Sequence, residues 1–523
     1  MAASPTSPRP TPPLGQSITT GGSTGRFDID NTLFISKDTS LTLSPESLII
    51  KGAETAKKPE KGAKPAGARR SVTLDSSAYS EPVGTSNLRA IPLRRILWAE
   101  LTDTELIINY AKEVSKTVFQ AAVLNYIIEE ERDRVEAWAS RLKDRAYGKS
   151  QQKKRVKVLI NPKSGKGQSE KIYAKDVAPI LDAAHLSVDL TVTKASKEAI
   201  DIVEKLDIEA YDVIICCSGD GLPFEVFNGL GKRKDAKRAL SKMAIAHIPC
   251  GSGNGFHCSL HGNVRSTSFA ALSIVKGVRT PLDLISITQG EERHLSFLSQ
   301  ALGIVAEFDL GTEHLRWMGG TRFIYGFIVK SLQKKIFPCD IAVKVVTDDK
   351  EEIKRRYHET IELGATSEEV LRENGLLEGG LPELKFGTAS DPLPEDWEVE
   401  NHDNMGSFYC GNMSWMGADV DYFPAALPND GCMDMVTIDY SNLSRLQALQ
   451  LLPAVESGKF FGLPYVNYRK VEAYRITPKN QSDGYISIDG ERVPFAPFQA
   501  EVHRGLGTVI SNSGYKYETV GPQ

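Results

Sequence analysis

The spacing of hydrophobic positions changes twice along the chain, and each change predicts a different architecture. Residues 1–25 are rich in Ser, Pro, Thr and Gly and have no apolar period, so a disordered tail is expected. Residues 26–147 predict a small β-rich module closed by one helix. Its strand-like apolar runs occur at residues 32–35, 48–50, 71–74, 96–100, 106–110 and 123–128. The apolar face of its helix comprises Val135, Trp138, Ala139, Leu142 and Ala146.

This order of strands and one Trp-bearing helix resembles a pleckstrin-homology domain. A plain β-extension packed on the following domain explains the same pattern, and the sequence leaves both interpretations open. A basic stretch at residues 51–70, rich in Lys, Ala and Gly, interrupts the module. We interpret it as a disordered, solvated linker, with electrostatic attraction to an anionic membrane surface as the alternative.

From residue 154 the pattern becomes a strand, a glycine-containing turn and a helix, repeated. Strands are predicted at residues 156–160 and 213–217, with a strand and helix within 186–206 and a fourth strand in the segment that begins at residue 243. This rhythm predicts a doubly wound α/β domain over residues 154–280. The loops of such a domain gather at the carboxyl ends of its strands.

After about residue 281 the pattern is mostly that of strands and predicts an antiparallel β-sandwich over residues 281–511. The predicted strands lie at residues 283–288, 341–347, 353–357, 407–412, 433–440 and 471–476. A stretch rich in Gly, Glu and Pro at residues 365–402 is expected to be an exposed loop. Residues 512–523 would form a tail.

Composition narrows the functional class. The chain has 523 residues, enough for two or three domains, and its formal net charge of −4 gives no overall basic field for nucleic acid. No apolar run approaches the roughly 18 residues of a membrane helix, and the N-terminus lacks the apolar segment of a secretory signal. All seven cysteines lie at or after Cys216 without a CxxC motif, which favours a reduced, cytosolic compartment.

Histidines do not indicate a metal centre. His247, His257, His261 and His503 show no metal-ligand spacing, so we interpret them as structural. Cys216 and Cys217 lie within a buried-type strand and are interpreted as core thiols.

The first candidate for a functional site is the turn Ser218-Gly219-Asp220-Gly221, which joins a predicted strand to a predicted helix. Glycines let a ligand approach the backbone, a helix N-terminus offers free N–H groups to an anion, and a carboxylate can accept a proton. A four-residue pattern of this kind is also compatible with a plain turn.

Two more small-residue turns follow predicted strands of the same sheet. The turn at residues 161–167 carries two lysines and does not have the spacing of a P-loop; alone, it is equally a cationic surface turn. The turn at residues 249–255 reads Pro-Cys-Gly-Ser-Gly-Asn-Gly. Because the three turns would share one sheet edge, together they predict a phosphate cradle.

In this order and spacing the three turns resemble the lipid kinase superfamily of diacylglycerol, ceramide and sphingosine kinases. The segment 308–316, continued by Gly319 and Arg322-Phe323, is similar to the sphingosine kinase block in which an aspartate precedes two arginines. Residues 488–491, Ile-Asp-Gly-Glu, are similar to a late block of the superfamily. The resemblance covers residues 154–511, and the segment 96–101 also resembles the longer fungal and plant long-chain-base kinases.

The resemblance implies a role for each matching residue. Asp220 would be the general base, or would orient the acceptor hydroxyl. The ATP site would be lined by Asn161, Pro162, Lys163, Thr193, Lys194, Ala195, Ser196, Lys197, Glu225, Gly251, Ser252, Gly253, Asp489 and Gly490, with Arg316 and Arg322 on the phosphates. The lipid head group would contact Ser218, Gly219, Asp220, Gly221, Ser299 and Asp309. No motif supplies direct metal ligands; Mg²⁺ would enter with ATP, and Glu491 is a candidate ligand.

The chemistry of these residue types agrees with the assignment. Phosphoryl transfer needs alignment and charge neutralisation, which N–H groups, cations and Mg²⁺ provide. Two arginines six residues apart suit phosphate oxygens, although they are also compatible with an ordinary helix surface. A carboxylate such as Asp309 suits a cationic head group, whereas a neutral diacylglycerol would not require it. The predicted activity is therefore ATP-dependent phosphorylation of the primary hydroxyl of sphingosine, dihydrosphingosine or phytosphingosine.

Three alternatives remain at this point: a ceramide or diacylglycerol kinase, an NAD kinase, and a non-catalytic lipid-binding scaffold. The Asp309 block and the turn at 249–255 disfavour the NAD kinase, and the intact Asp220, Lys163 and Asp489 disfavour the scaffold. A lipid substrate implies a protein that is cytoplasmic and docks peripherally on the endoplasmic reticulum, Golgi or plasma membrane. The oligomeric state stays open, a homodimer included.

Overall fold

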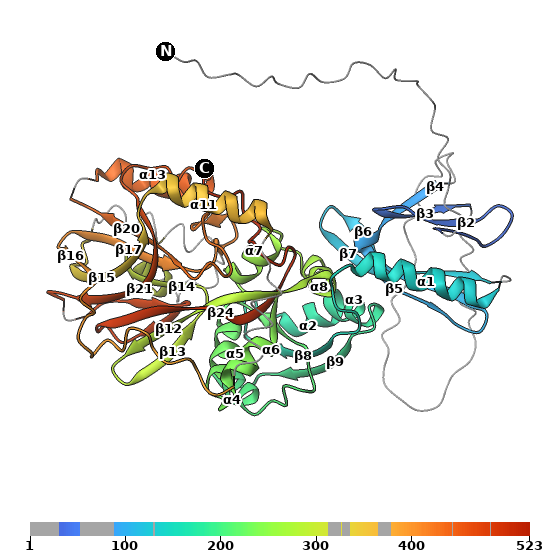
Figure 1. Ribbon diagram of the computed structural model, residues 1–523, viewed down its shortest axis with the longest axis horizontal. Helices are drawn as coiled ribbons and strands as arrows, with labels where there is room; N and C mark the ends of the chain where they lie inside the picture. The colour runs from blue at the N-terminus through green and yellow to red at the C-terminus, as the bar shows by residue number, and fades with distance from the viewer. Residues whose placement is uncertain are drawn as a thin grey trace, which may run out of the picture.

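The computed structural model describes residues 31–52, 88–128, 131–311, 326, 335–364, 378–441, 443–481 and 483–523. Three parts follow one another in space: a small N-terminal module, an α/β domain in the middle and a β-rich domain at the other end (Figure 1). The expected tail at 1–25, the expected strand at 71–74 and most of the basic stretch 51–70 lie outside the described residues.

The N-terminal module consists of two antiparallel sheets and a closing helix, as its apolar pattern predicts. The first sheet contains β1 (Thr32–Phe34), β2 (Ser40–Leu43), β3 (Ser47–Lys51) and β4 (Leu88–Pro92). After the 3₁₀ turn η2 (Leu93–Arg95), the second sheet contains β5 (Ile96–Leu101), β6 (Glu105–Ser115) and β7 (Val118–Ile127). The apolar face of α1 (Arg132–Tyr147) is buried, including Trp138, whose Nε1 donates to the Asn31 carbonyl at 3.1 Å. β2 and β4 were not predicted, and the pleckstrin-homology resemblance stays a prediction.

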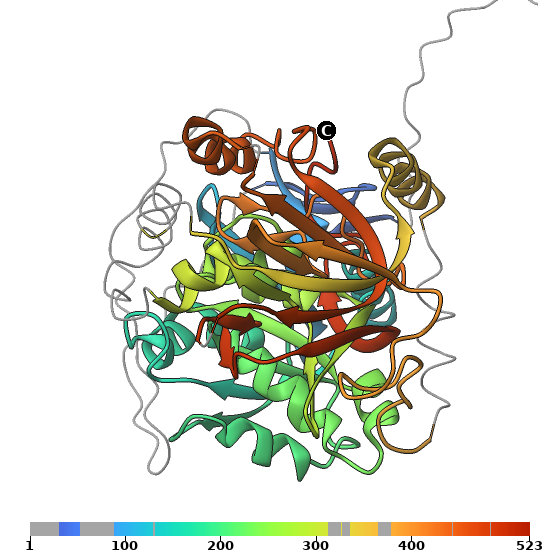
Figure 2. The same ribbon diagram turned by 90° about the vertical axis from the view of Figure 1, so that its left-hand side faces the viewer.

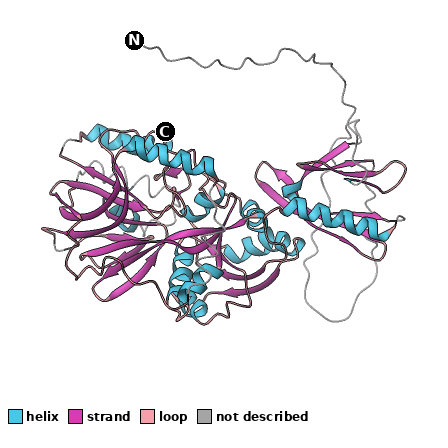
Figure 3. Ribbon diagram, in the orientation of Figure 1, coloured by secondary structure: helices cyan, strands magenta, loops and turns pink. Residues whose placement is uncertain are grey.

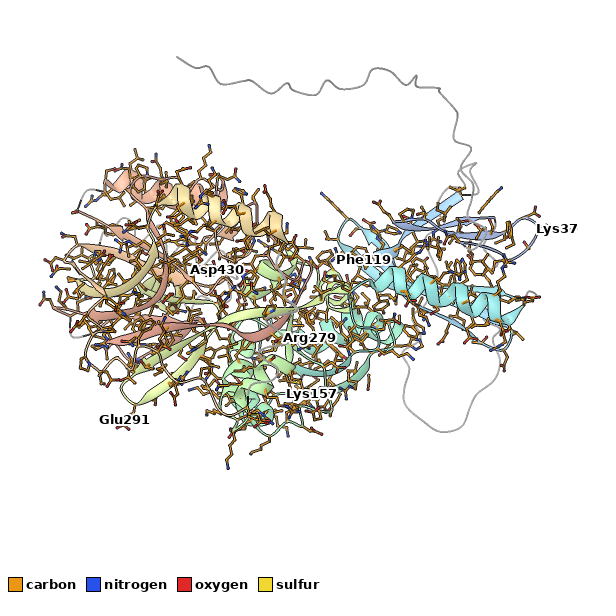
Figure 4. The ribbon with its side chains drawn as sticks, in the orientation of Figure 1. Lys37, Phe119, Lys157, Arg279, Glu291 and Asp430 are labelled. Atoms are coloured by element: carbon orange, nitrogen blue, oxygen red, sulfur yellow. The ribbon has the colours of Figure 1, made fainter. Side chains whose placement is uncertain are left out.

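One apolar core joins this module to the α/β domain. It runs without a break from Leu41 and Trp138 of the module to Val158 and Ala270 of the next domain. At the seam, the backbone N–H of Phe119 donates to Ser268 Oγ at 2.9 Å (Figure 4 labels Phe119). The module is therefore packed on the α/β domain rather than tethered to it.

The α/β domain begins with four parallel strands in the order β9 (Ser187–Val192), β8 (Arg155–Ile160), β10 (Val213–Ser218) and β11 (Ala244–Pro249). Successive residues of β10 enter different cores, Ile215 on one face and Ile214 on the other, which explains its uninterrupted apolar sequence. The helical segments are α2 (Ser169–Ile172), the π-helical turn η3 (Tyr173–Val177), α3 (Ala178–Ala183), α4 (Glu198–Glu204), α5 (Gly221–Gly231), α6 (Ala236–Lys242), α7 (Gly255–His261) and α8 (Thr267–Lys276).

Two long strands, β12 (Val278–Gln289) and β24 (Phe498–Ser511), connect the α/β domain to the β-rich domain. They pair antiparallel along almost their whole length, and β24 also pairs with β11 at one end and β21 at the other. Where their register shifts, the buried Asp283 carboxylate accepts from the N–H groups of Gly431 and Gly505. The expected boundary between residues 280 and 281 thus falls inside a strand.

The β-rich domain is built mainly from antiparallel strands, as expected (Figure 3). They are β13 (Glu292–Ser296), β14 (Ser299–Gly303), β15 (Cys339–Thr347), β16 (Glu398–His402), β17 (Met405–Gly411), β18 (Trp415–Gly417), β19 (Val420–Asp421), β20 (Met433–Asp439), β21 (Asn467–Pro478), β22 (Ile486–Ile488) and β23 (Glu491–Val493). The helices are α9 (Ile304–Gly311), α11 (Lys350–Leu363) and α13 (Arg445–Glu456). α11 and α13 lie along the same side of the strands in both views (Figures 1 and 2).

Three expectations for this domain are corrected. Residues 353–357 belong to helix α11, because Asp349 caps its N-terminus and Ile353 and Tyr357 lie on one buried helical face. The loop expected at 365–402 ends in β16, which pairs with β15. The segment 512–523 is packed rather than a loose tail, since Tyr517 is buried and donates to the Asn412 carbonyl at 2.7 Å.

None of the helices within the described ranges is long and apolar enough to cross a bilayer. All seven cysteines are free thiols, and Cys216 and Cys217 are fully buried in β10 as expected.

The packing of α1 predicts the stability of the module. Replacing Trp138 by Ala should lower the free energy of unfolding of the transition that includes this module by about 3–5 kcal/mol, because the substitution leaves a cavity. Glu136→Ala, on the exposed side of the same helix, should change it by less than about 0.5 kcal/mol. Denaturant unfolding of the full chain measures both, and equal unfolding curves for the two variants would contradict this account of the core.

Candidate active site

The three glycine-containing turns meet at the carboxyl ends of β8, β10 and β11. A Cβ atom on Gly251 would lie 2.4 Å from Gly219 Cα, and one on Gly165 would lie 2.3 Å from the Cys250 carbonyl oxygen. Gly165 also has a φ of +55°. Only glycine allows the backbones to approach this closely, so the small residues identified in the sequence are required by the contact of one turn with another.

Hydrogen bonds hold the three turns in register. The Gly219 N–H donates to Ser164 Oγ at 2.8 Å, which joins the first turn to the second. The Gly251 N–H donates to the Ser218 carbonyl at 3.1 Å, which joins the second turn to the third. The same N–H donates to Asn254 Oδ1 at 2.9 Å within the third turn. The predicted meeting of the turns is confirmed.

Asp220 lies at the centre of this junction, directly before α5. Its Oδ2 accepts from the Gly255 N–H at 3.0 Å and its Oδ1 from the Phe256 N–H at 3.1 Å, both at the start of α7. Burial raises the pKa of this carboxyl, and the hydrogen bonds from Phe256 and Gly255 oppose that shift. A rigidly held carboxylate with a raised pKa is well suited to accept a proton.

The loop at residues 193–197 borders the same edge of the sheet. Lys194, Ala195, Ser196 and Lys197 are exposed there. The Glu225 carboxylate on α5 accepts from the N–H groups of Lys197 at 3.0 Å and Ala199 at 3.1 Å. Glu225 therefore braces the loop, a role that the sequence did not indicate.

Two of the predicted contact residues turn their side chains inward. Thr193 is buried, and its hydroxyl donates to the Ile160 carbonyl at 3.2 Å. Ser218 is 1% exposed, and its hydroxyl donates to the Gly219 carbonyl at 2.6 Å. Both hydroxyls therefore donate to backbone carbonyls at this edge of the sheet. Of the other predicted ATP-lining residues, Lys163 is exposed, and Asn161, Pro162, Ser252 and Gly253 are partly exposed at the turns.

Asp489 also has a buried carboxylate that accepts hydrogen bonds from a neighbouring segment of the chain. It is 3% exposed, and its carboxylate accepts from Ser296 Oγ at 2.6 Å and from the N–H groups of Phe297, Leu298 and Ser299 at 2.8–3.0 Å. Both oxygens are therefore occupied by donors of the chain itself. It fixes the turn that leads into β14 and so positions Ser299.

Glu491 is exposed near the catalytic turn. A Cβ atom on Gly221 would lie 3.5 Å from Glu491 Oε1. Burial raises the pKa of Glu225, the N–H donors of Lys197 and Ala199 oppose that shift, and the negative charge of Glu491 adds to it. Within the described residues no group of three or more His, Cys, Asp or Glu side chains could hold a metal ion. The exposed Glu491 carboxylate nevertheless fits Mg²⁺, which commonly takes one or two carboxylates together with substrate phosphates.

Asp309, on α9, approaches the same site from the β-rich domain. Its Oδ2 accepts from Ser487 Oγ at 3.1 Å and lies 4.0 Å from the position of a Cβ atom on Gly490. An apolar cluster lies beside it, formed by Ala301, Ile304, Val305, Ala306, Phe308, Tyr409 and Tyr485. An acidic group beside an apolar cluster matches a lipid with a cationic head. Arg316 and Arg322 lie outside the described residues.

Tyr409 is a site residue that the sequence analysis did not find. Its Oη accepts a hydrogen bond from Ser299 Oγ at 3.3 Å, and its ring packs on Tyr422 and Phe423. Burial, together with the charges of Asp309, Asp489 and Asp220, raises the pKa of Tyr409, so its phenol stays protonated. Its sequence context gave no local signal, because its neighbours Asp309, Asp489 and Asp220 come from distant segments.

Comparison with known families agrees with this division of the chain. Residues 155–287 match the diacylglycerol kinase catalytic domain, and residues 398–511 match a YegS C-terminal NAD kinase beta sandwich-like domain. Residues 31–148 match a domain of unknown function. A solved structure titled as a putative diacylglycerol kinase from Bacillus anthracis is 19% identical, with a TM-score of 0.47, and covers 69% of this chain and 97% of its own.

Curated relatives narrow the family. Sphingoid long chain base kinase 5 of Saccharomyces cerevisiae is 33% identical over 428 aligned residues. The match covers 72% of this chain and 62% of the relative, so the chain spans less than two thirds of that relative's length. Sphingoid long chain base kinase 4 of Schizosaccharomyces pombe is 32% identical over 444 residues, 84% of this chain and 92% of the relative. The chain therefore belongs to the sphingoid long-chain-base kinases, the sphingosine kinases of the diacylglycerol-kinase-like lipid kinase superfamily.

Proposed function

We propose that this protein transfers the γ-phosphoryl group of ATP to the primary hydroxyl of sphingoid long-chain bases such as sphingosine, dihydrosphingosine and phytosphingosine. The observation that carries the proposal is the position of Asp220. Its carboxylate is held between three interlocked glycine turns on one side, and Asp309 with its apolar neighbours lies on the β-rich side of the same region.

The glycine turns are proposed to hold the nucleotide. Backbone N–H groups at the carboxyl edge of a parallel sheet are suitable donors to phosphate oxygens, and Lys163 adds a positive charge. The exposed loop of Lys194–Lys197, fixed by Glu225, would border the nucleotide. Arg316 and Arg322 stay candidates for the phosphates from the family resemblance alone.

Asp220 is proposed to accept the proton of the acceptor hydroxyl. As the lipid oxygen attacks the γ-phosphorus, its O–H bond breaks and the proton passes to the Asp220 carboxylate, while the bond from phosphorus to the ADP oxygen breaks. The N–H groups of Gly255 and Phe256 fix the orientation of the carboxylate during this transfer. The exposed Glu491 carboxylate is the candidate residue to hold Mg²⁺ together with the phosphates, and the ion would supply positive charge there.

Asp309 is proposed to pair with the ammonium group of the lipid, with Ser299 and Tyr409 as polar neighbours. The apolar cluster around Ile304 and Phe308 would receive the start of the hydrocarbon chain. Since this lipid resides in membranes, the protein is proposed to dock peripherally on a membrane of the endoplasmic reticulum, Golgi or cell surface. A ceramide or diacylglycerol kinase, which handles a neutral lipid, is the alternative that the experiments below distinguish.

A substrate panel tests the reaction. The wild-type chain should phosphorylate free sphingoid bases and leave ceramide, diacylglycerol and NAD unphosphorylated. Asp220→Asn should lower kcat by about 10²- to 10⁴-fold, the range expected for loss of a general base. Because a base must be ionised and burial raises the pKa of Asp220, wild-type kcat should fall with decreasing pH at a midpoint above that of an exposed aspartate. Preferential turnover of a neutral lipid would overturn the substrate assignment.

The head-group assignment predicts a different kinetic effect. Asp309→Asn should raise KM for sphingosine by about 10- to 100-fold, because a hydrogen bond to a charged group contributes about 1.5–3 kcal/mol. The KM for ATP, measured on the same protein, is the internal control and should not change. An unaltered KM for sphingosine would remove Asp309 from the head-group site.

The contact between turns can be tested by adding one methyl group. Gly251→Ala would place a Cβ atom 2.4 Å from Gly219 Cα and force the turns apart, so kcat/KM for ATP should fall by about 100-fold, as for a small misplacement of catalytic groups. Gly380→Ala is the matched control, since no atom lies within 4 Å of its added Cβ. Wild-type kinetics in Gly251→Ala would contradict the interlocked geometry.

A further inference from the structure

His247 lies on β11 directly beneath the catalytic turn and is fully buried. Its Nε2 is 2.9 Å from the carbonyl oxygen of Ser218. A carbonyl accepts hydrogen bonds and cannot donate them, so Nε2 carries the ring proton and Nδ1 carries a lone pair. Nδ1 has no hydrogen-bond partner among the described residues.

The lone pair of His247 Nδ1 faces the catalytic carboxylate. Nδ1 lies 3.9 Å from Asp220 Oδ1, and the His247 side chain is 0% exposed. Asp220 Oδ1 accepts one hydrogen bond, from Phe256, and an ionised carboxylate oxygen can accept a second. Two acceptors therefore lie close together, one on the fully buried His247 and one on Asp220, whose side chain is 14% exposed.

Such an arrangement costs free energy while both groups lack a proton and becomes favourable once one proton lies between them. A buried acceptor without a donor keeps its full desolvation penalty, and a hydrogen bond formed in the same place removes it. The present separation exceeds a hydrogen bond by about 1 Å, and catalytic hydrogen bonds often shorten to about 2.6–3.2 Å only in the reacting complex.

We propose that His247 and Asp220 form an acid–base pair that shares the proton released by the acceptor hydroxyl. The inference rests on the proposed function. The proton leaves the lipid oxygen and bonds to Asp220, and the resulting O–H then hydrogen-bonds to, or protonates, His247 Nδ1. The Nε2–H stays on the Ser218 carbonyl throughout. The pair gains one positive charge and becomes neutral, which keeps the proton away from the departing phosphoester. His247 acts through Asp220 and is a positioning residue.

The surroundings of His247 keep it neutral before the reaction. Burial lowers its pKa to about 4. The other titratable groups near the pair are His257 and Cys258 on α7, Cys216 on β10 and the protonated Tyr409 on β17. His261 lies beyond His257, and Asp309 and Asp489 act on Tyr409 together with Asp220. Burial lowers the pKa of His257 to about 4 and raises that of Cys216 and of Cys258, so these groups are also neutral at physiological pH. Asp220 is then the charge that a proton on His247 would balance.

The test compares the pH dependence of kcat in the full-length wild type, His247→Phe and His261→Phe. Phenylalanine keeps the ring and removes the nitrogens. His247→Phe should lower kcat by about 10-fold, a part of the range for acid–base catalysis, and shift the acid limb of kcat to lower pH. In wild type, His247 Nδ1 would accept a hydrogen bond from protonated Asp220 and so stabilise that form. The variant lacks this acceptor, so the pKa of Asp220 falls and the acid limb moves to lower pH. His261→Phe changes another buried histidine, which is separated from His247 by His257, and should follow the wild-type profile. The KM for ATP should not change in either variant.

A spectroscopic readout separates this role from packing. In wild-type protein labelled with ¹⁵N-histidine, the His247 Nδ1 resonance should move toward the protonated position as Asp220 titrates. It is assigned by its loss in His247→Phe or, if that variant folds poorly, in His247→Gln. In Asp220→Asn it should stop responding in that pH range. A reduced kcat without a shift of the acid limb, or an Nδ1 resonance independent of Asp220, would overturn the pair, even if His247→Phe folds poorly, because the resonance is measured on wild-type protein. A wild type that phosphorylates no sphingoid base would overturn the proposed function instead.

Discussion

The close contact between glycine backbones at Gly219 and Gly251 is the constraint on which the site depends. It allows the turn after β10 and the turn after β11 to share hydrogen bonds, and it brings Asp220 against the first N–H groups of α7. These N–H groups are unsatisfied within the helix, so they bind the carboxylate and fix its direction. A side chain at Gly251 would separate the turns, and the carboxylate would lose both its position and its buried surroundings.

The second half of the site depends on the strands that cross between domains. Because β24 pairs with β11, β12 and β21, the β-rich domain is held to the α/β sheet by backbone hydrogen bonds. The Asp489 carboxylate accepts hydrogen bonds from the N–H groups of Phe297, Leu298 and Ser299, and these bonds fix the start of β14. The groups proposed for the nucleotide and for the lipid are thus connected through one sheet rather than across a flexible linker.

The features that were predicted correctly from the sequence are those determined by residues close to one another along the chain. The apolar strands and the glycine turns after them follow from backbone geometry, so the junction around Asp220 was visible from spacing alone. Residues 353–357 were misassigned because their content resembles a strand, whereas the Asp349 cap and the four-residue spacing of Ile353 and Tyr357 favour a helix. The bracing roles of Glu225 and Asp489 could not be predicted, since their hydrogen-bond donors come from distant segments. For the same reason His247, interpreted as a structural histidine, gave no sign of its position beside Asp220.

The most direct test is the structure of the protein in complex with sphingosine and a non-hydrolysable ATP analogue. The account predicts that the primary hydroxyl oxygen of the lipid lies about 2.6–3.2 Å from an Asp220 carboxylate oxygen. The γ-phosphoryl group should face that hydroxyl from the glycine turns, and the lipid nitrogen should contact Asp309. A hydroxyl bound away from Asp220, or a nucleotide bound away from the three turns, would contradict the account.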